Sequence, residues 1–245
     1  MLAWREITVK YKQSVMGFMW AVLMPALIVA SGVLVRFAFS KLQGTPLTLD
    51  DVALVSVKSV PWAFFISAIR FCSMSLVSNA NLVAKIYMPR EVFPLASILS
   101  QAMDLAVASG VLVVVLALAG VGISPQILWI PLLLTLLFLL ATGIGLFVSA
   151  AGLFFRDVKY LVEVFVTFAI FFTPVFYESA LFGEWGRILL LNPVAPILEG
   201  FANAIVHQRV PALGWLAYSA VASTVIFVGA WRTFRRLEPY FAQCV

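Results

Sequence analysis

The sequence is poor in charge. Only 11% of its 245 residues are Asp, Glu, Lys or Arg, whereas 63% are hydrophobic. Soluble domains carry about 25% charged residues, and a soluble protein of this length could not bury so much apolar surface in one core. An ordinary soluble domain is therefore excluded, and a lipid bilayer is expected to surround most of the chain. The basic residues stand singly between apolar runs, so they form no stripe of the kind that binds nucleic acid.

Cysteine and histidine are nearly missing too. Cys72 lies inside an apolar run and Cys244 is the penultimate residue, which excludes a disulfide framework and a metal site. His207 is the single histidine, and for such a residue a surface position is commoner than a catalytic one. No Walker A motif, zinc-protease motif or nucleophile elbow occurs. We therefore expect no enzyme activity and no cofactor in this chain. If ATP drives the protein, ATP and Mg must bind a separate partner subunit.

Long apolar runs, by contrast, are abundant. A helix that spans a bilayer needs about 20 predominantly apolar residues. Six transmembrane helices are predicted, at residues 15–39, 60–83, 93–121, 127–155, 160–177 and 213–234. The expected fold class is an all-α integral membrane protein in which residues 1–245 form a single transmembrane domain.

Two segments outside these spans have a character of their own. Residues 1–13 mix aromatic, apolar and basic side chains, which favours a helix in the membrane interface over a plain positive anchor. Residues 178–212 are moderately apolar and broken by prolines, which favours short re-entrant helices, such as 194–206, over a surface loop. Irregular backbone at membrane depth has to be satisfied by protein or water, so this extracytoplasmic segment is a candidate lining or gate.

The loop charges predict an orientation. If both termini are cytoplasmic, the inside segments hold ten basic residues: Arg5, Lys10, Lys12, Lys85, Arg90, Arg156, Lys159, Arg232, Arg235 and Arg236. The outside segments hold five: Arg36, Lys41, Lys58, Arg187 and Arg209. Because cytoplasmic loops carry the excess of Lys and Arg, both termini are predicted to be cytoplasmic.

Three ionisable residues fall within predicted spans. A lone charge in hydrocarbon costs at least about 2.5–3.5 kcal/mol, so it normally faces the bundle interior or water. Arg70 and Asp104 each lie about ten residues into antiparallel spans, and we predict that they pair. The pair would be either a structural lock between two helices or a polar wall of a conduit. Glu163 lies near the inner face, where it would snorkel or meet Lys159.

Aromatic residues recur at helical spacing in the fifth span and also occur in the first. The candidate lining residues are Phe18, Trp20, Phe37, Phe165, Phe168, Phe172, Phe176 and Tyr177. Such stripes commonly pack against neighbouring helices or lipid. The alternative is a pore lined by rings, which would stack weakly on sugars and let a long polymer slide.

Four sequence segments resemble those of a known family. They are residues 5–20, with Pro25 following; residues 79–94, Asn-Ala-Asn-Leu-Val-Ala-Lys-Ile-Tyr-Met-Pro-Arg-Glu-Val-Phe-Pro; Phe-Arg-Asp-Val-Lys at 155–159 with Phe-Thr-Pro-Val-Phe-Tyr at 172–177; and Leu-Asn-Pro-Val-Ala-Pro at 191–196. In this order they resemble the ABC-2 permeases that export O-antigen and teichoic acid polysaccharides.

The resemblance implies a homodimer bound to two copies of an ABC ATPase subunit. It implies a short cytoplasmic coupling helix that docks on that ATPase, with an ordinary loop as the alternative. The coupling residues would be Val83, Lys85, Ile86, Tyr87, Met88, Arg90 and Glu91. It also implies that the first and fifth helices line the conduit. Arg5, Lys10 and Lys12 would lie near lipid headgroups or the diphosphate of the substrate.

The expected function is export of a lipid-linked, O-antigen-like polysaccharide across the bacterial inner membrane, as part of lipopolysaccharide biosynthesis. Within transport, the alternatives are teichoic acid, capsule polysaccharide, or a small drug or lipid. A membrane-embedded transferase would need clustered acidic or histidine groups, and a passive channel would have no use for a docking loop.

Overall fold

A computed structural model describes residues 19–44, 46–85 and 88–243. The regular structure of these residues is entirely helical. The predicted interfacial helix at residues 1–13 lies outside the described residues, as do Arg5, Lys10, Lys12 and Phe18.

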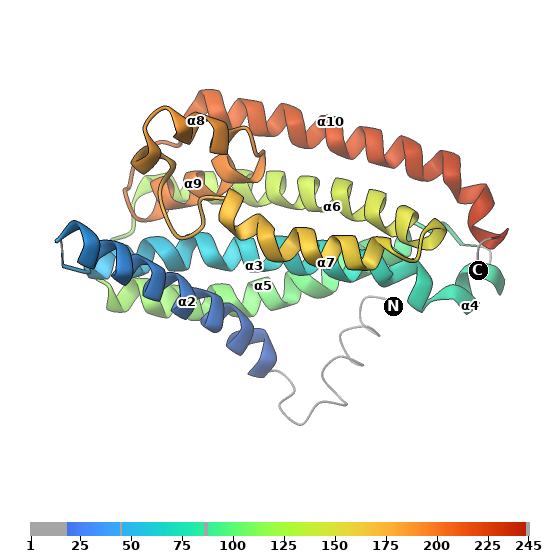
Figure 1. The fold of residues 1–245 in the computed structure, drawn as a ribbon, viewed down its shortest axis with the longest axis horizontal. Helices are drawn as coiled ribbons and strands as arrows, with labels where there is room; N and C mark the ends of the chain where they lie inside the picture. The colour runs from blue at the N-terminus through green and yellow to red at the C-terminus, as the bar shows by residue number, and fades with distance from the viewer. Residues whose placement is uncertain (1–18, 45, 86–87, 244–245) are drawn as a thin grey trace.

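Four helices within the described residues are long and apolar enough to cross a membrane. They are α3 (Leu49–Ser78), α5 (Val92–Leu118), α6 (Ile130–Phe154), which continues the 3₁₀ turn η1 (Pro125–Trp129), and α10 (Leu213–Leu237). All run side by side along the long axis of the molecule (Figure 1). They correspond to the second, third, fourth and sixth predicted spans.

Helix α3 begins earlier than predicted. The second span was predicted at residues 60–83, yet the helix starts at Leu49. The cause is a capping box, in which the Thr48 side chain accepts from the Asp51 backbone N–H and the Asp51 carboxylate accepts from the Thr48 N–H. Reciprocal capping satisfies N–H groups that are otherwise unpaired at a helix start. It thereby stabilises a polar first turn that hydropathy alone places in a loop.

The first predicted span forms one long helix, whereas the fifth is shorter than predicted. The first corresponds to α2 (Met19–Gln43), which has 25 residues. The fifth was expected to reach residue 177, but α7 (Val158–Ala169) and η2 (Ile170–Phe172) end at Phe172, and Thr173 is extended. At 1.5 Å per residue the 12 residues of α7 cover about 18 Å, whereas the hydrocarbon core is about 30 Å thick. Helix α7 alone is therefore shorter than a span.

The segment after α7 contains three short helices, η3 (Ser179–Phe182), α8 (Trp185–Leu190) and α9 (Val194–Ile205). The helix predicted at 194–206 is confirmed as α9, which starts after Pro193. Its buried face packs on α3 and α6. In Figure 1, α8 and α9 lie at the end of the bundle opposite α4 (Ala80–Lys85) and the C-terminus.

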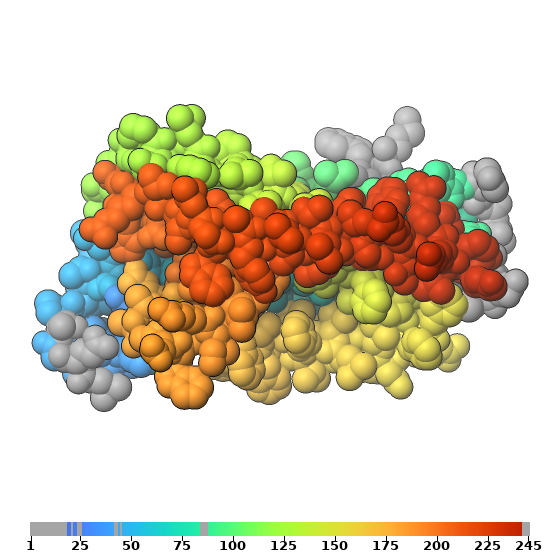
Figure 2. Space-filling view, turned by 90° about the horizontal axis from the view of Figure 1, so that it is seen from above, coloured from blue at the N-terminus to red at the C-terminus, as the bar shows by residue number. Residues whose placement is uncertain are grey.

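Helix α3 is the most enclosed of the four long helices, and the main core surrounds it. Helices α2, α5, α6, α7 and α9 all pack against it. Helix α10 instead packs along α6 and covers one face of the molecule, as Figure 2 shows. A second, smaller apolar cluster lies near α4 and is made by Leu76, Val83, Phe93, Leu146, Ala150, Leu153, Ala230, Phe234 and Phe241.

Candidate functional site

The aromatic side of α7 is exposed in the single chain. Phe165, Phe168 and Phe172 are 73%, 55% and 70% exposed. Val162 and Val166, on the opposite side of the helix, are buried in the main core. Spacing of three to four residues places the three rings on one face, so α7 packs through its valines and presents a row of aromatic rings outward.

The predicted stripe does not continue past Phe172. Phe176 lies beyond the end of η2, where the helical period no longer applies, and its ring packs on Gly32 of α2. A Cβ added at Gly32 would lie 2.5 Å from that ring, so a glycine is needed at this contact. Tyr177 is half-buried, and its hydroxyl donates to the Phe171 carbonyl at 2.9 Å. These two rings therefore pack within the non-helical segment that follows η2, and they are not part of the exposed row.

Helix α2 has exposed rings of its own, at two of the positions predicted to line a channel. Trp20 and Phe37 are 41% and 46% exposed. The Lys41 ammonium lies over the Phe37 ring, 5.5 Å from its centre, within the range of a cation–π contact. Both α2 and α7 pack on α3, and Figure 1 shows both on the same side of the bundle.

The prediction for Arg70 names the wrong partner. Its guanidinium lies 2.8 Å from the carboxylate of Glu163 on α7, rather than pairing with Asp104. Arg70 and Asp104 do line the same cavity, of about 320 Å³, together with Gln101 and Trp20. Arg70 and Asp104 therefore lie near each other, as their positions along the two spans predicted. Position along a span does not show which acidic group the long Arg70 side chain reaches.

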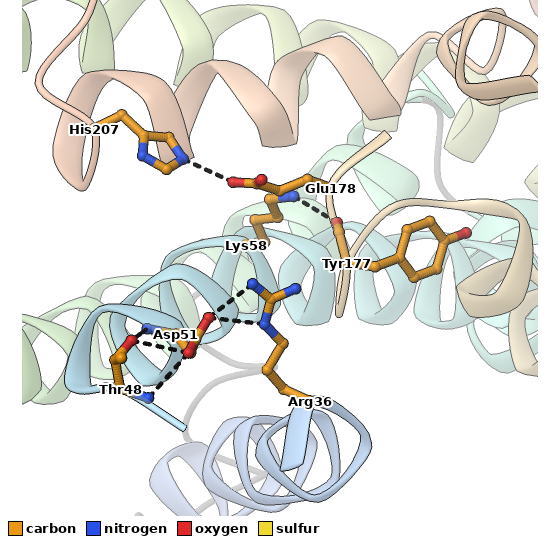
Figure 3. A network of polar contacts seen from close by, with 7 residues as sticks. All are labelled: Arg36, Thr48, Asp51, Lys58, Tyr177, Glu178 and His207. Carbon is orange, nitrogen blue, oxygen red and sulfur yellow. Dashed lines mark hydrogen bonds and ion pairs between the residues drawn. The ribbon is translucent and has the colours of Figure 1, made fainter. Parts of the chain in front are cut away.

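A polar network at the α8–α9 end was not predicted. Lys58 is fully buried, and its ammonium donates to the carbonyls of Pro174 and Tyr177 at 3.1 and 2.7 Å. His207 lies 2.8 Å from Glu178 (Figure 3). Lys58 therefore links α3 to the non-helical segment that follows η2. The sequence signal was a lysine within an apolar run, which we counted only as an outside charge.

Two further contacts fix the same end of the molecule. Arg36 on α2 forms an ion pair of 2.7 Å with Asp51 (Figure 3). Asn192 donates to the Thr173 hydroxyl at 2.9 Å, which links the segment before α9 to the end of η2.

A polar cavity of about 250 Å³ lies between Lys58, α9 and residues 207–209. Among the described residues, no cluster of three or more acidic, histidine or cysteine side chains could hold a metal ion.

The predicted coupling segment is only partly helical in the structure. Helix α4 spans Ala80–Lys85, upstream of the predicted centre, and residues 88–91 form a bend and turn. The Lys85 side chain, Ile86 and Tyr87 lie outside the described residues. Val83 is buried, and Met88 packs against the smaller apolar cluster.

The turn formed by residues 88–91 contacts the C-terminal end of the chain. Glu91 is buried, and its carboxylate lies 2.8 Å from the Arg235 guanidinium. The backbone N–H of Arg90 donates to the Glu238 carboxylate at 3.1 Å, and its guanidinium donates to the Glu238 carbonyl. Arg90 and Glu91 of the predicted docking segment are thus engaged with α10 and with η4 (Glu238–Gln243).

Comparison with known proteins identifies the family of this chain. The chain is 25% identical to the O-antigen export system permease protein RfbA of Klebsiella pneumoniae over 245 residues, which is 98% of this chain and 91% of that protein. It is 23% identical to the protein of the same name from Myxococcus xanthus, over 100% of this chain and 94% of that protein. The family model of the ABC-2 type transporters matches residues 1–206. This chain belongs to the ABC-2 type transporter family.

Proposed function

We propose that this chain is the transmembrane subunit of an ATP-driven exporter that moves a lipid-linked, O-antigen-like polysaccharide across the bacterial inner membrane. Its similarity to O-antigen export permeases over nearly its whole length supports this assignment. The observation that carries the proposal is the row of exposed rings on α7 and η2, formed by Phe165, Phe168 and Phe172.

This surface suits a glycan because it combines two kinds of contact. Apolar faces of sugar rings stack on aromatic side chains, while hydroxyls hydrogen-bond with a guanidinium or a carboxylate. Arg70 on α3 and Glu163 on α7 supply both ionic groups where these two helices meet. The rings project as a row, so each would make a weak contact and a polymer would not be held at one point.

A single chain leaves this surface open, so a second copy is proposed to close the conduit. Charged side chains within membrane helices normally face a protein interior or a water-filled cavity. The Arg70 and Glu163 side chains are 43% and 50% exposed, which a homodimer would place beside a conduit instead of lipid. In this arrangement α2 and α7 flank the path. Together with the four long helices, α2 and the consecutive helices α7 and η2 would give six membrane-crossing segments.

The chain is proposed to work with two copies of a separate ABC ATPase subunit, which would bind ATP and Mg. The turn formed by residues 88–91 and α4 is the proposed docking point. This end of the bundle also holds the C-terminus (Figure 1) and is rich in Arg and Lys, which supports a cytoplasmic location of both termini.

The double substitution Phe168→Ala with Phe172→Ala tests the proposed conduit. Export of lipid-linked polysaccharide, measured as glycan that reaches the outer surface, should fall several-fold while the ATPase subunit still co-purifies. Phe147→Ala, at a 56% exposed ring on α6, is the matched control and should export normally. Undiminished export by the double variant at full expression would refute the aromatic conduit. Efflux of a small amphiphile in place of glycan would favour the drug or lipid alternative.

A further inference from the structure

The end of α10 and the start of η4 hold the turn formed by residues 88–91 through one ion pair and two hydrogen bonds. Arg235 pairs with Glu91 at 2.8 Å, and the Glu91 residue is only 7% exposed. Glu238 accepts from the Arg90 N–H through its carboxylate and from the Arg90 guanidinium through its carbonyl. Hydrogen bonds that involve ionised groups are the stronger ones. A partly buried carboxylate that loses its partner is also costly.

An apolar contact reinforces the same connection. Phe241 of η4 is fully buried, and its ring centre lies 5.1 Å from that of Phe234 and 5.8 Å from that of Phe154. The same cluster contains Val83 of α4 and Phe93 of α5. Dense packing of this kind transmits displacement because it has few voids to absorb it. Residues from α4, α5, α6, α10 and η4 are therefore joined in one block.

The turn formed by residues 88–91 is connected to two long helices, α5 and α10. Val92, the first residue of α5, follows the turn directly, so a displacement of the turn reaches α5 through the backbone. Without the C-terminal contacts, α10 would be reached only through packing between helices. Arg235 and Glu238 connect the turn to α10 directly, across 144 and 148 positions in sequence.

We propose that residues 88–91, the end of α10 and η4 form one rigid coupling unit, in which Arg235 and Glu238 are positioning residues that deliver the stroke of the ATPase to α10 and α5 together. This inference rests on the proposed function, because it requires a motor that docks at the turn. It assigns a mechanical role to the end of α10 and to η4, for which no sequence pattern predicted a role.

The first experiment removes the connection and leaves the docking turn in place. Glu238→Ala and Arg235→Ala should retain co-purification of the ATPase subunit and ATP hydrolysis, while glycan exported per ATP hydrolysed falls several-fold. Glu238→Gln, which keeps an acceptor oxygen for the Arg90 N–H, should recover most of the coupling. Arg236→Ala, at an exposed residue on the same turn of α10, is the matched control and should behave as wild type. Wild-type export per ATP in both alanine variants would overturn the proposal.

The second experiment replaces the connection by a covalent one. In a Cys244→Ser background, Arg90→Cys with Glu238→Cys removes the Arg90–Glu238 hydrogen bonds, keeps the Arg235–Glu91 pair, and permits a short thiol crosslinker to join positions 90 and 238. The reduced protein should be poorly coupled, and crosslinking should restore export because the two parts move together. If crosslinking instead abolishes the remaining export, the parts must separate during transport and the rigid unit is wrong. Failure of the ATPase to co-purify with the wild-type chain would instead refute the proposed function.

Discussion

The Arg70 and Glu163 side chains are nearly half exposed in the single chain, although both lie on helices of the bundle. Exposed ion pairs in water contribute little to stability, whereas unpaired charges that face lipid are expensive. A half-exposed ion pair is more stable beside water or another protein surface than beside lipid. We therefore propose that the α3–α7 surface does not face lipid.

A charge exchange tests the pairing. Arg70→Glu with Glu163→Arg should recover much of the thermal stability lost by either single substitution, because the opposite charges remain adjacent. Arg70→Asp with Asp104→Arg should give no such recovery, since it leaves Glu163 beside a new acidic group. The measurement is the unfolding temperature of each variant in detergent. Recovery by the Asp104 exchange alone would contradict the pairing that the structure shows.

At the element scale, close approach of helices depends on a few glycines. Gly143 of α6 lies against α10 so closely that an added Cβ would be 2.8 Å from the Phe227 Cα. Gly152 of α6 is similarly close to the Ser73 carbonyl of α3, at 2.5 Å. Small residues at such contacts let backbones approach, which is how helices associate within membranes. Helix α6 is therefore held tightly between α3 and α10.

Substitution of Gly143 tests this packing. Gly143→Ala should destabilise the protein by about 1–3 kcal/mol, because the contact is with backbone that cannot rotate away. Gly110→Ala is the control, since no atom lies within 4 Å of its added Cβ. In a helix interior that control should be neutral or should stabilise by up to about 1 kcal/mol. Equal unfolding temperatures for the two variants would show that the α6–α10 contact is looser than described.

For the whole molecule, the two ends of the bundle have different chemistry. The end with α4 and the C-terminus carries Arg90, Arg235 and Arg236. The other end carries α8 and α9 with the mixed network of Lys58 and Glu178 (Figures 1 and 3). An excess of basic residues at one end is the feature that fixes orientation in the membrane. The molecule is therefore polarised along its long axis.

Labelling of single cysteines tests this polarity. In the Cys244→Ser background, Glu184→Cys should react with a membrane-impermeant maleimide from outside the inner membrane, because Glu184 is exposed at the α8 end. Arg156→Cys, at the exposed α6–α7 connection, should react only after the inner membrane is permeabilised. The reverse pattern would place the coupling turn outside the cytoplasm and would contradict the proposed function as well.

The sequence alone determined the bilayer environment, the all-helical class and four of the long helices, because each depends on local composition over about 20 residues. The family resemblance came from four motifs in order along the chain. The sequence also predicted a helix where α9 forms, directly after Pro193. From the regular rise of a helix it predicted Arg70 and Asp104 at one depth, and in the structure both line one cavity.

Tertiary structure decided what local composition could not. The start of α3 depends on a capping box, the fifth helix ends where Thr173 becomes extended, and the partner of Arg70 lies 93 positions away. The clamp between Glu91 and Arg235 joins residues 144 positions apart. The capping box is local, because Thr48 and Asp51 are three residues apart. The Arg70–Glu163 and Glu91–Arg235 contacts, by contrast, join polar groups that the packing of distant helices brings together. A pattern with a period of 3.6 residues gives the face of a helix, but it carries no information about which helix that face meets.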